Sequence, residues 1–462
     1  MAGSSTDVIT LYEWDWENDG VFDYSSASSS AQHAYSSDGN YTVRLRVWDE
    51  DSYDDDTATV TVSNDAPVIQ SMSVASPINE GSDTTLTAVA TDTGEDDKNL
   101  TFLVNWGDLS TTSGVITSGT QLTLSHTYTD NGTYAVSLTI TDSDGATDFD
   151  TRNVEVLNVA PTVEVLYPSG GEVLSKSVKI NWTFSDPSTD DTFTSKLYYS
   201  DDSGATWNLI VSLFGTSQGL NSYTWNTSPV IMYSDSVLIN ATVVDDDSEI
   251  GSDVSDAVFT VDNQAPVVSI TLPAEHANAT DNWYKGTIGI NHAETDNNLD
   301  YCQYLINMPG MSWTNLTCNS VLNLDTATGC MDGENICTVH VRAFDKGGNV
   351  GNANVTFSVD NSAATITSVN LSDYIVQPGS VVELLSDGTD AQGVKSCWAF
   401  MYNSTGGQVS SFNLGNDCKQ DVTLPVVSDG NYTIDVRVRN NAGTDSWGYT
   451  SVSYTHLTLP TN

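Results

Sequence analysis

The chain has 462 residues, and its 61 acidic residues outnumber its 14 basic ones, which gives a formal net charge of −47. Such a charge repels phosphate backbones and anionic lipids, so it argues against nucleic acid and against direct membrane contact as partners. The same charge favours solubility and the binding of divalent cations. Hydrophobic residues make up 39% of the chain, which suits several small sandwiches better than one large core.

One strand-turn unit recurs along the chain. In residues 126–145, apolar residues alternate with small polar ones from Tyr134 to Ile140, and an acidic turn that contains Gly145 follows. This period of two is typical of a strand with one buried face. Similar units occupy residues 33–51, 237–247, 336–348 and 430–439. Their spacing of roughly 90 to 105 residues indicates domains of immunoglobulin-like size.

A second repeated motif marks the domain boundaries. Asn-x-Ala-Pro, or a degenerate form of it, begins at Asn64, Asn158, Asn263 and Asn361. A proline at such a place can end one strand and open the next at a sheet edge. We therefore predict an all-β, linear array of five immunoglobulin-like β-sandwich domains, the first of them truncated. The predicted domains are residues 1–65, 66–160, 161–264, 265–362 and 363–453.

The two ends of the chain do not fit the repeat. The first domain begins at a Trp-Asp turn without the strands that should precede it, which is why we expect it to be truncated. Residues 454–462 match no repeat and resemble vector or adapter sequence, so we treat them as a non-native tail outside the fold. No apolar run approaches the length of a membrane span, and no basic-then-apolar signal segment opens the chain.

The first two domains carry a more specific pattern. An acidic turn containing tryptophan, at residues 14–16 and 106–108, precedes His-x-Tyr and Gly-x-Tyr-x-Val segments at residues 33–43 and 126–136. This pattern resembles that of the polycystic-kidney-disease (PKD) domain. The three later domains resemble bacterial immunoglobulin-like and fibronectin-type-III-like repeats. The resemblance implies a tandem repeat region of a large prokaryotic, including archaeal, surface or secreted protein, with sandwiches that serve as extracellular spacers or adhesion modules without catalysis.

The six cysteines lie in the last two predicted domains, four in one and two in the other. Even numbers per domain indicate internal disulfides formed in an oxidising compartment. Alignment of the repeats, and elimination for the remaining pair, gives three predicted bridges: Cys302 with Cys318, Cys330 with Cys337, and Cys397 with Cys418. A zinc site is the alternative, but the spacings lack a tight Cys-x-x-Cys knuckle.

A calcium site is predicted near the N-terminus. Acidic side chains hold positions 1, 3, 5 and 9 of a loop similar to that of an EF-hand: Asp15, Glu17, Asp19 and Asp23. Gly20, at position 6, permits the sharp turn such a loop needs. Position 12 holds a serine in place of the usual bidentate glutamate, so we expect an affinity of only ~10⁻⁴ to 10⁻³ M, as in extracellular modules. A solvated acidic turn is the alternative interpretation.

Other motifs are interpreted as structural. The acidic turns at residues 49–51, 142–144 and 245–247 form a second, weaker set of calcium candidates, and we expect them to be solvated turns. Gly215-Thr-Ser-Gln-Gly219 matches the nucleophile elbow of hydrolases, but that elbow needs a helix after its serine, and another strand is expected there. Residues 200–207 resemble the Asp-box of sialidase-like propellers and predict a hairpin turn pinned by Asp202. His33 and His126 recur at one repeat position, which indicates packing or hydrogen bonding at a strand start.

Two functional hypotheses remain. The first is a non-catalytic stalk or adhesion array, extracellular or at the cell surface, with other surface proteins or glycans as partners. The second is the accessory binding region of a secreted protease or glycoside hydrolase whose catalytic domain lies outside this sequence. The adjoining coding sequence would distinguish them, since a hydrolase domain supports the second and further repeats with an anchor support the first.

Overall fold

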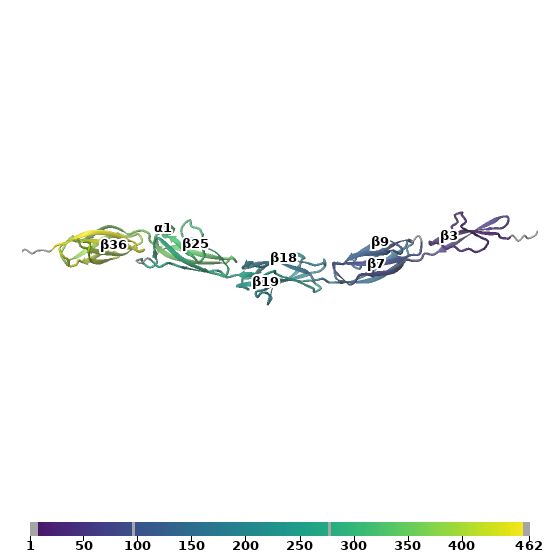
Figure 1. Cartoon of the computed structure of the whole chain (residues 1–462), viewed down its shortest axis with the longest axis horizontal. Helices are drawn as coiled ribbons and strands as arrows, with labels where there is room; N and C mark the ends of the chain where they lie inside the picture. The colour runs from purple at the N-terminus through teal and green to yellow at the C-terminus, as the bar shows by residue number, and fades with distance from the viewer. Residues whose placement is uncertain (1–7, 95–97, 276–278, 456–462) are drawn as a thin grey trace, which may run out of the picture.

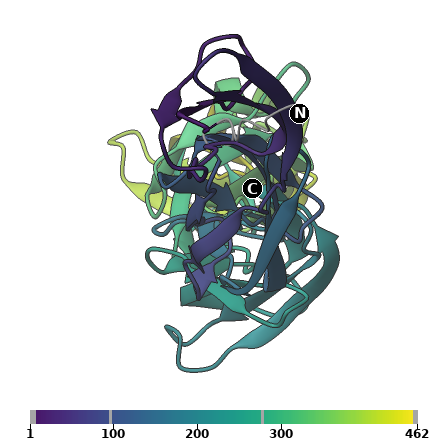
Figure 2. The same ribbon diagram turned by 90° about the vertical axis from the view of Figure 1, so that its right-hand side faces the viewer.

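The computed structural model describes residues 8–94, 98–275 and 279–455. Figure 1 shows the domains placed end to end in one file, and Figure 2, which looks along that file, shows them projected over one another. In the described part of the chain the fold is almost entirely β, because the one helix there, α1 (Thr326–Gly329), has only 4 residues. The predicted all-β array of immunoglobulin-like sandwiches is confirmed.

The first domain contains a single four-stranded sheet among its described residues, in the order β2-β1-β3-β4. Its strands are β1 (Leu11–Asp15), β2 (Tyr24–Ser26), β3 (Gly39–Trp48) and β4 (Tyr53–Val62). Because no second sheet among those residues covers this one, most of β3 is half exposed. Trp16 and Val43 are its buried hydrophobic residues.

The second domain is a complete sandwich of two sheets, β10-β7-β5 and β6-β12-β11-β8-β9. Its strands are β5 (Val68–Val74), β6 (Ile78–Asn79), β7 (Asp83–Thr91), β8 (Asn99–Asn105), β9 (Thr111–Thr117), β10 (Gln121–Thr127), β11 (Gly132–Thr141) and β12 (Thr147–Leu157). Strand β11 carries the alternation found in the sequence, with Val136, Leu138 and Ile140 fully buried. The predicted buried face is therefore the face that packs on the opposite sheet.

The third domain repeats this plan with one additional strand, β20, which pairs with β19. Its sheets are β13-β15-β18 and β14-β21-β19-β16-β17. Its strands are β13 (Thr162–Tyr167), β14 (Val173–Leu174), β15 (Ser177–Ser185), β16 (Phe193–Ser200), β17 (Asn208–Thr216), β18 (Gly219–Asn226), β19 (Tyr233–Val244), β20 (Ile250–Val254) and β21 (Phe259–Asp262). Trp182 on β15 is fully buried at the centre of the core.

The fourth domain has the sheets β22-β24-β27 and β23-β29-β28-β25-β26. Its strands are β22 (Val267–Thr271), β23 (Trp283–Tyr284), β24 (Thr287–Thr295), β25 (Leu299–Ile306), β26 (Thr314–Leu316), β27 (Val321–Asp325), β28 (Gly333–Asp345) and β29 (Val350–Val359). Helix α1 lies between β27 and β28, and the Asp325 carboxylate caps it by accepting a hydrogen bond from the Ala327 amide.

The fifth domain has the sheets β30-β32-β35 and β31-β37-β36-β33-β34. Its strands are β30 (Thr365–Leu371), β31 (Ile375–Val376), β32 (Val381–Thr389), β33 (Val394–Tyr402), β34 (Gln408–Gly415), β35 (Lys419–Thr423), β36 (Gly430–Asn440) and β37 (Asp445–Tyr454). Strand β37 ends at Tyr454, a core residue with 2% of its surface exposed. Tyr454 therefore belongs to the domain, and its assignment to the non-native tail was wrong; residues 456–462 lie outside the described residues.

The last four domains are copies of one design. In each, a two-residue strand pairs in parallel with the closing strand, as β6 does with β12, β14 with β21, β23 with β29 and β31 with β37. Each of these domains also has its own hydrophobic cluster, formed by residues of both its sheets. Because no cluster is shared between domains, the core of each one is complete without its neighbour.

Candidate functional sites

The predicted calcium loop joins β1 to β2. The buried carboxylate of Asp15 accepts hydrogen bonds from the backbone amides of Asp19 (3.1 Å) and Gly20 (2.9 Å). Asp23 Oδ2 accepts one from the amide of Trp16 over 3.0 Å. The loop can turn this sharply because Gly20 adopts a φ of 91°, which side chains disfavour. These bonds hold two of the predicted ligands on opposite sides of the turn.

Three of the four predicted ligands lie together. Asp15, Glu17 and Asp23 each supply one carboxylate oxygen, and these oxygens lie within 4.8 Å of one another. Asp19 is not part of this group, and its Oδ1 accepts a hydrogen bond from the Val21 amide over 2.8 Å. A set of three carboxylates fits a hard cation such as calcium, whose remaining ligands would be backbone carbonyls and water. Calcium at this loop stays a prediction.

The histidines of the first two domains belong to aromatic stacks. His126 on β10 stacks on Trp106 at 4.6 Å between ring centres, and its Nε2 lies 2.7 Å from Asp108 Oδ2. Tyr128 meets the same histidine edge-on and donates from its hydroxyl to the Trp106 carbonyl over 2.8 Å. Burial raises the pKa of Tyr128 well above its usual range, so its hydroxyl stays protonated. The stack therefore ties the tryptophan turn to the strand that follows it.

The first domain repeats this arrangement. His33 stacks on Trp16 at 4.9 Å and meets Tyr35 edge-on, and the Tyr35 hydroxyl donates to the Trp16 carbonyl over 3.1 Å. The recurring Trp, His and Tyr residues thus have the same packing role in both domains. Spacing in the sequence indicated that they form a unit, but the stacking itself depends on the turn that brings the tryptophan back over the histidine.

The cysteines form three disulfides within their own domains. The structure brings together each predicted pair: Cys302 with Cys318, Cys330 with Cys337, and Cys397 with Cys418. The first and third bridges occupy the same place in their repeats, joining β25 and β33 to the loops before β27 and β35. The second closes the short loop between α1 and β28. Cys318 is half-buried and the other five cysteines are buried, which favours a structural role for the bridges.

A serine, a histidine and a glutamate lie in line beside the first disulfide. Ser320 Oγ is 3.2 Å from His292 Nε2, and His292 Nδ1 is 2.7 Å from Glu294 Oε1. This order matches that of a catalytic triad. However, the Ser320 hydroxyl donates to the Thr317 carbonyl, and the side chains of His292 and Glu294 are fully buried. Glu294 also accepts from the Asn319 amide over 2.7 Å, so the network fixes the turn after Cys318.

The two hydrolase-like motifs occupy hairpins. Ser217 of the Gly-x-Ser-x-Gly match lies between β17 and β18, so a strand stands where a nucleophile elbow needs a helix. In the Asp-box-like turn, Asp202 Oδ1 accepts from the Ser200 hydroxyl (2.7 Å) and the Thr206 amide (2.8 Å). These bonds lower the pKa of Asp202 to about 2. Both segments are structural turns.

Two of the three acidic turns that were expected to be solvated, those at residues 142–144 and 245–247, contact the domain linkers instead. Asp142 and Asp245 are buried, with 6% and 5% of their surfaces exposed. Asp142 Oδ2 accepts from Asn64 Nδ2 over 2.9 Å, and Asp245 Oδ2 accepts from Asn158 Nδ2 over 3.2 Å. Each asparagine opens an Asn-x-Ala-Pro linker, and each aspartate lies in the turn that follows a long strand of the next domain, β11 or β19. The solvated interpretation was wrong for these two residues, because the linker covers the turn.

The next two junctions are also closed by hydrogen bonds. Between the third and fourth domains, Ser175 Oγ donates to the Gly347 carbonyl (2.6 Å) and Asn349 Nδ2 donates to the Asp262 carbonyl (2.7 Å). Between the fourth and fifth, Lys285 Nζ donates to Thr444 Oγ1 over 2.8 Å. Each junction therefore has direct contacts that oppose free rotation of one domain on the next.

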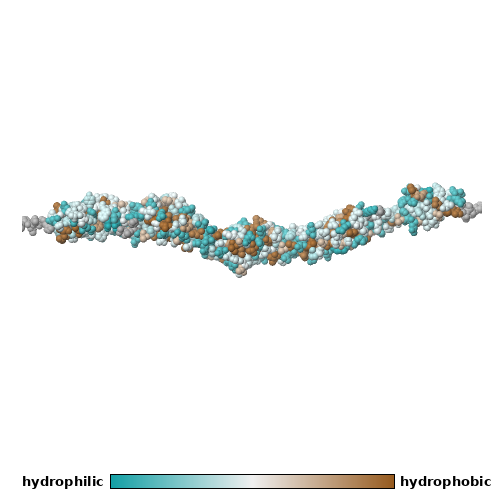
Figure 3. Space-filling model, viewed as in Figure 1, coloured by the Kyte–Doolittle hydropathy of each residue, from teal (hydrophilic) through white to brown (hydrophobic). Residues whose placement is uncertain are grey.

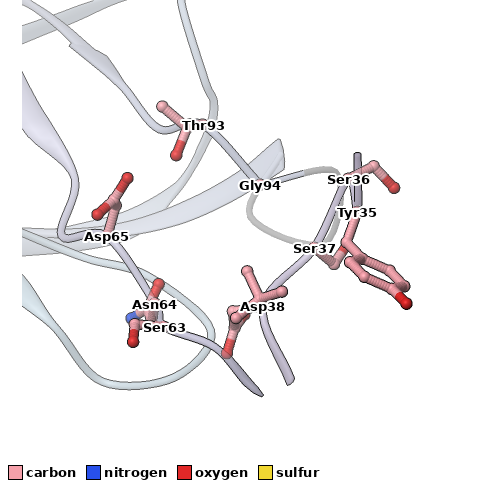
Figure 4. A pocket seen from close by; sticks show the side chains of 10 residues that line it. Tyr35, Ser36, Ser37, Asp38, Ser63, Asn64, Asp65, Thr93 and Gly94 are labelled. Atoms are coloured by element: carbon pink, nitrogen blue, oxygen red, sulfur yellow. The ribbon is translucent and has the colours of Figure 1, made fainter. Parts of the chain in front are cut away.

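A polar cavity of about 210 Å³ lies between the first and second domains. Figure 4 shows Tyr35, Asp38 and the linker residue Asn64 on its wall, opposite Thr93 of the second domain. Its lining offers hydroxyl and carboxylate groups, but no histidine or lysine is among the lining residues to act as a base at neutral pH. The cavity is a polar gap at a junction.

Comparison with known families agrees with the aromatic pattern. Residues 2–62 and residues 64–156 each match a model of the PKD domain. The chain is a tandem repeat region in which PKD domains are followed by immunoglobulin-like sandwiches. A comparison with curated protein sequences gives no match. No helix in the described ranges has the length and apolar character needed to cross a membrane.

Several solved structures are similar to parts of the array. A tetra-tandem repeat in the extending region of a large adhesion protein is 16% identical, covers 84% of this chain and 98% of its own, and has a TM-score of 0.31. The PKD domain of an M14-like peptidase from a Thermoplasmatales archaeon is 31% identical over 20% of this chain and 98% of its own, with a TM-score of 0.18. The PKD1 domain of Vibrio anguillarum Epp is 28% identical over 20% of this chain and 96% of its own, with a TM-score of 0.17.

Proposed function

We propose that this chain is a non-catalytic spacer, an extended stalk that holds another part of an extracellular protein away from its point of attachment. The observation that carries the proposal is the end-to-end file of domains with a hydrogen-bonded junction between each pair of neighbours. A spacer needs length and resistance to bending, and short clamped linkers supply both.

The surface and the covalent structure suit this role outside the cell. Figure 3 shows apolar residues in small groups along the whole length of the visible face, with hydrophilic residues between them. Three internal disulfides are typical of proteins exposed to an oxidising environment. We place the chain in an extracellular or cell-surface protein, and we propose other surface proteins or glycans as its partners, to be tested on a glycan array and by binding to intact cells.

Small-angle scattering tests the spacer role. A sandwich with strands of ~8 residues at ~3.3 Å each, plus its end loops, is ~35 to 40 Å long, so the file should span roughly 150 to 200 Å. A rod of that length has a radius of gyration of roughly 43 to 58 Å, whereas a compact chain of this size has about 23 Å. A value near the compact limit would contradict the proposal. The adjoining coding sequence then decides whether the spacer serves an adhesin or a secreted hydrolase.

A further inference from the structure

Three carboxylates from two different domains meet at the junction between the second and third sandwiches. Glu80 follows β6 in the second domain, and Asp186 and Asp191 lie in the loop between β15 and β16 of the third. One carboxylate oxygen from each lies within 4.8 Å of the other two. The group therefore exists only while the two domains are held against each other.

The backbone around Glu80 is fixed at this junction. The Glu80 amide donates to the Leu157 carbonyl over 3.0 Å, and the Gly81 amide donates to the Tyr128 carbonyl over 2.8 Å. Gly81 has a φ of 70°, and a Cβ atom added to it would lie only 2.5 Å from Cβ of Pro187 in the third domain. Glycine thus permits a close approach that brings Glu80 against the loop carrying both aspartates.

Each of the three carboxylates has one oxygen bonded within the protein and one without a donor. Glu80 Oε1 accepts from the linker amide of Val159 over 2.8 Å. Asp186 Oδ1 accepts from the Ser188 amide, and Asp191 Oδ1 accepts from the Ser188 hydroxyl. The second oxygen of each carboxylate is buried and accepts no hydrogen bond. Glu80 is the most enclosed of the three residues, with only 2% of its surface exposed. In the part of the chain that the structure describes, no salt bridge reaches any of the three.

Burying three carboxylates close together disfavours their charged forms, and the pKa values of all three are raised. Burial raises the pKa of Glu80 to about 7, and the neighbouring charges of Asp191, Asp186 and Asp130 add to the rise. Burial also raises the pKa values of Asp186 and Asp191. Buried carboxylates without a counter-charge destabilise a fold, and a bound cation removes that cost by pairing with all of them at once.

We propose that Glu80, Asp186 and Asp191 bind one divalent cation, calcium by preference, which joins the second domain to the third. The ligands are all carboxylate oxygens, which hard cations favour, and oxygens around one calcium ion at 2.3 to 2.6 Å are separated by no more than about 5 Å. Asp130 and Asp247 form an overlapping group with Asp191, so further oxygens from both domains lie at the same face of the junction. The inference goes beyond the spacer function and stands on the junction geometry alone.

The next junction along the chain also holds an acidic group, but two of its carboxylates accept hydrogen bonds from asparagine side chains. Asp262, Asp296 and Asp345 also lie within 4.8 Å of one another between the third and fourth domains. There, however, Asp262 Oδ2 accepts from Asn298 Nδ2 over 3.0 Å, and Asp345 Oδ2 accepts from Asn349 Nδ2 over 2.9 Å. Amide hydrogens take the place that a cation would fill, so that group carries no proposal.

Calcium titration of the metal-stripped full chain by calorimetry tests the site. Glu80→Gln keeps an oxygen for the Val159 amide but removes the charge, so it should bind one equivalent of calcium fewer than the wild type. Asp190→Asn changes an exposed residue of the same loop and should bind as many equivalents as the wild type. Equal stoichiometry in Glu80→Gln and wild type would overturn the proposal. Binding of magnesium in place of calcium would overturn the choice of ion.

Hydrogen exchange on the wild-type chain gives a second test that needs no variant to fold. Calcium should slow exchange both in the linker, residues 157–161, and in the loop, residues 186–191, since the ion would hold the two together. Protection of neither segment at saturating calcium would overturn the proposal, whatever the titration of Glu80→Gln gives. Protection confined to residues 11–26 would assign the bound calcium to the first domain alone and would also overturn it.

Discussion

Asn158 and Asp245 belong to neighbouring domains, and Asn158 Nδ2 donates a hydrogen bond to Asp245 Oδ2 over 3.2 Å. The other oxygen of Asp245 accepts from the Glu249 amide within its own turn over 2.8 Å. One buried carboxylate thus shapes the closing turn of the third domain and anchors the linker that leads into it. The pair Asn64 and Asp142 repeats the contact one domain earlier.

Asn158→Ala should loosen this junction. The change leaves Asp245 Oδ2 buried without its donor, and such an unsatisfied group costs about 1 to 3 kcal/mol. We expect a lower calorimetric melting temperature for the third domain and faster hydrogen exchange in residues 158–161. Asn208→Ala, at an exposed strand position, is the matched control. Equal exchange in both variants would mean that the linker is held by other contacts.

The disulfides should contribute to stability domain by domain. Replacing both Cys397 and Cys418 with alanine should lower the free energy of unfolding of the fifth domain by about 2 to 4 kcal/mol. The reason is that the bridge closes a loop in the unfolded chain, and without it the unfolded chain has more conformational entropy. The fourth domain should unfold as in the wild type, since its bridges are its own. Non-reducing peptide mapping checks the three pairs, and a peptide linking the two domains would contradict them.

Two variants of the first loop distinguish the ligand set of the structure from the set predicted by spacing. At calcium tenfold above Kd, binding should stabilise the first domain by ~1.4 kcal/mol. Glu17→Ala should abolish calcium protection of residues 11–26 against hydrogen exchange, whereas Asp19→Ala should retain it, because only Glu17 lies with Asp15 and Asp23. The reverse result would mean that the bound loop follows the EF-hand spacing.

The junction of the fourth and fifth domains should be sensitive to pH through Asp360. Burial raises the pKa of this carboxyl to about 6, with Asp390 and Asp332 adding to the rise, while Lys285 also faces it and Ser362 donates to it. A raised carboxyl pKa means that folding favours the protonated form, so the stabilisation is complete below pH ~3.8 and is lost as pH rises through about 6.

In the wild type, the melting temperature of the fourth and fifth domains should fall between pH 4 and pH 7. Asp360→Asn should make this fall smaller, because it removes the carboxyl group that titrates there. Asn361 and Ser362 keep their positions in the linker, so the variant changes the charge and little else. Asp373→Asn, at an exposed position, should leave the slope as it is in the wild type. Parallel slopes for Asp360→Asn and the wild type would assign the pH dependence to other groups.

The structure within each domain could be predicted from the sequence, whereas the contacts between neighbouring domains could not. Alternation from Tyr134 to Ile140 determines which face of β11 is buried, because that depends only on the residues of one strand. Repeat alignment gave the cysteine pairs for a similar reason, since equivalent strands place equivalent residues. Glu80 and Asp186 are far apart in the chain and belong to different repeats, so no periodicity relates them. Their proximity depends on how two finished domains meet.

The buried acidic turns show the same limit. Asp142 and Asp245 lie in turns rich in aspartate, and a turn of that composition is usually solvated. Their burial follows from the path of the preceding linker, which crosses the turn and supplies an asparagine donor. The Asn-x-Ala-Pro motif contained that signal: its asparagine recurs at every boundary, although a linker needs only the proline to break the strand.

The network of Ser320, His292 and Glu294 provides the sharpest test of the non-catalytic assignment. The Ser320 hydroxyl donates to the Thr317 carbonyl over 2.5 Å, and the histidine behind it is fully buried, so the serine should not act as a nucleophile. A fluorophosphonate probe should leave the chain unlabelled. Labelling that disappears in Ser320→Ala would contradict the assignment. Glu294→Gln, in contrast, should destabilise the fourth domain by about 1 to 3 kcal/mol, because a glutamine has one acceptor oxygen where the carboxylate offers one to His292 and another to the Asn319 amide, and a buried partner is left unsatisfied.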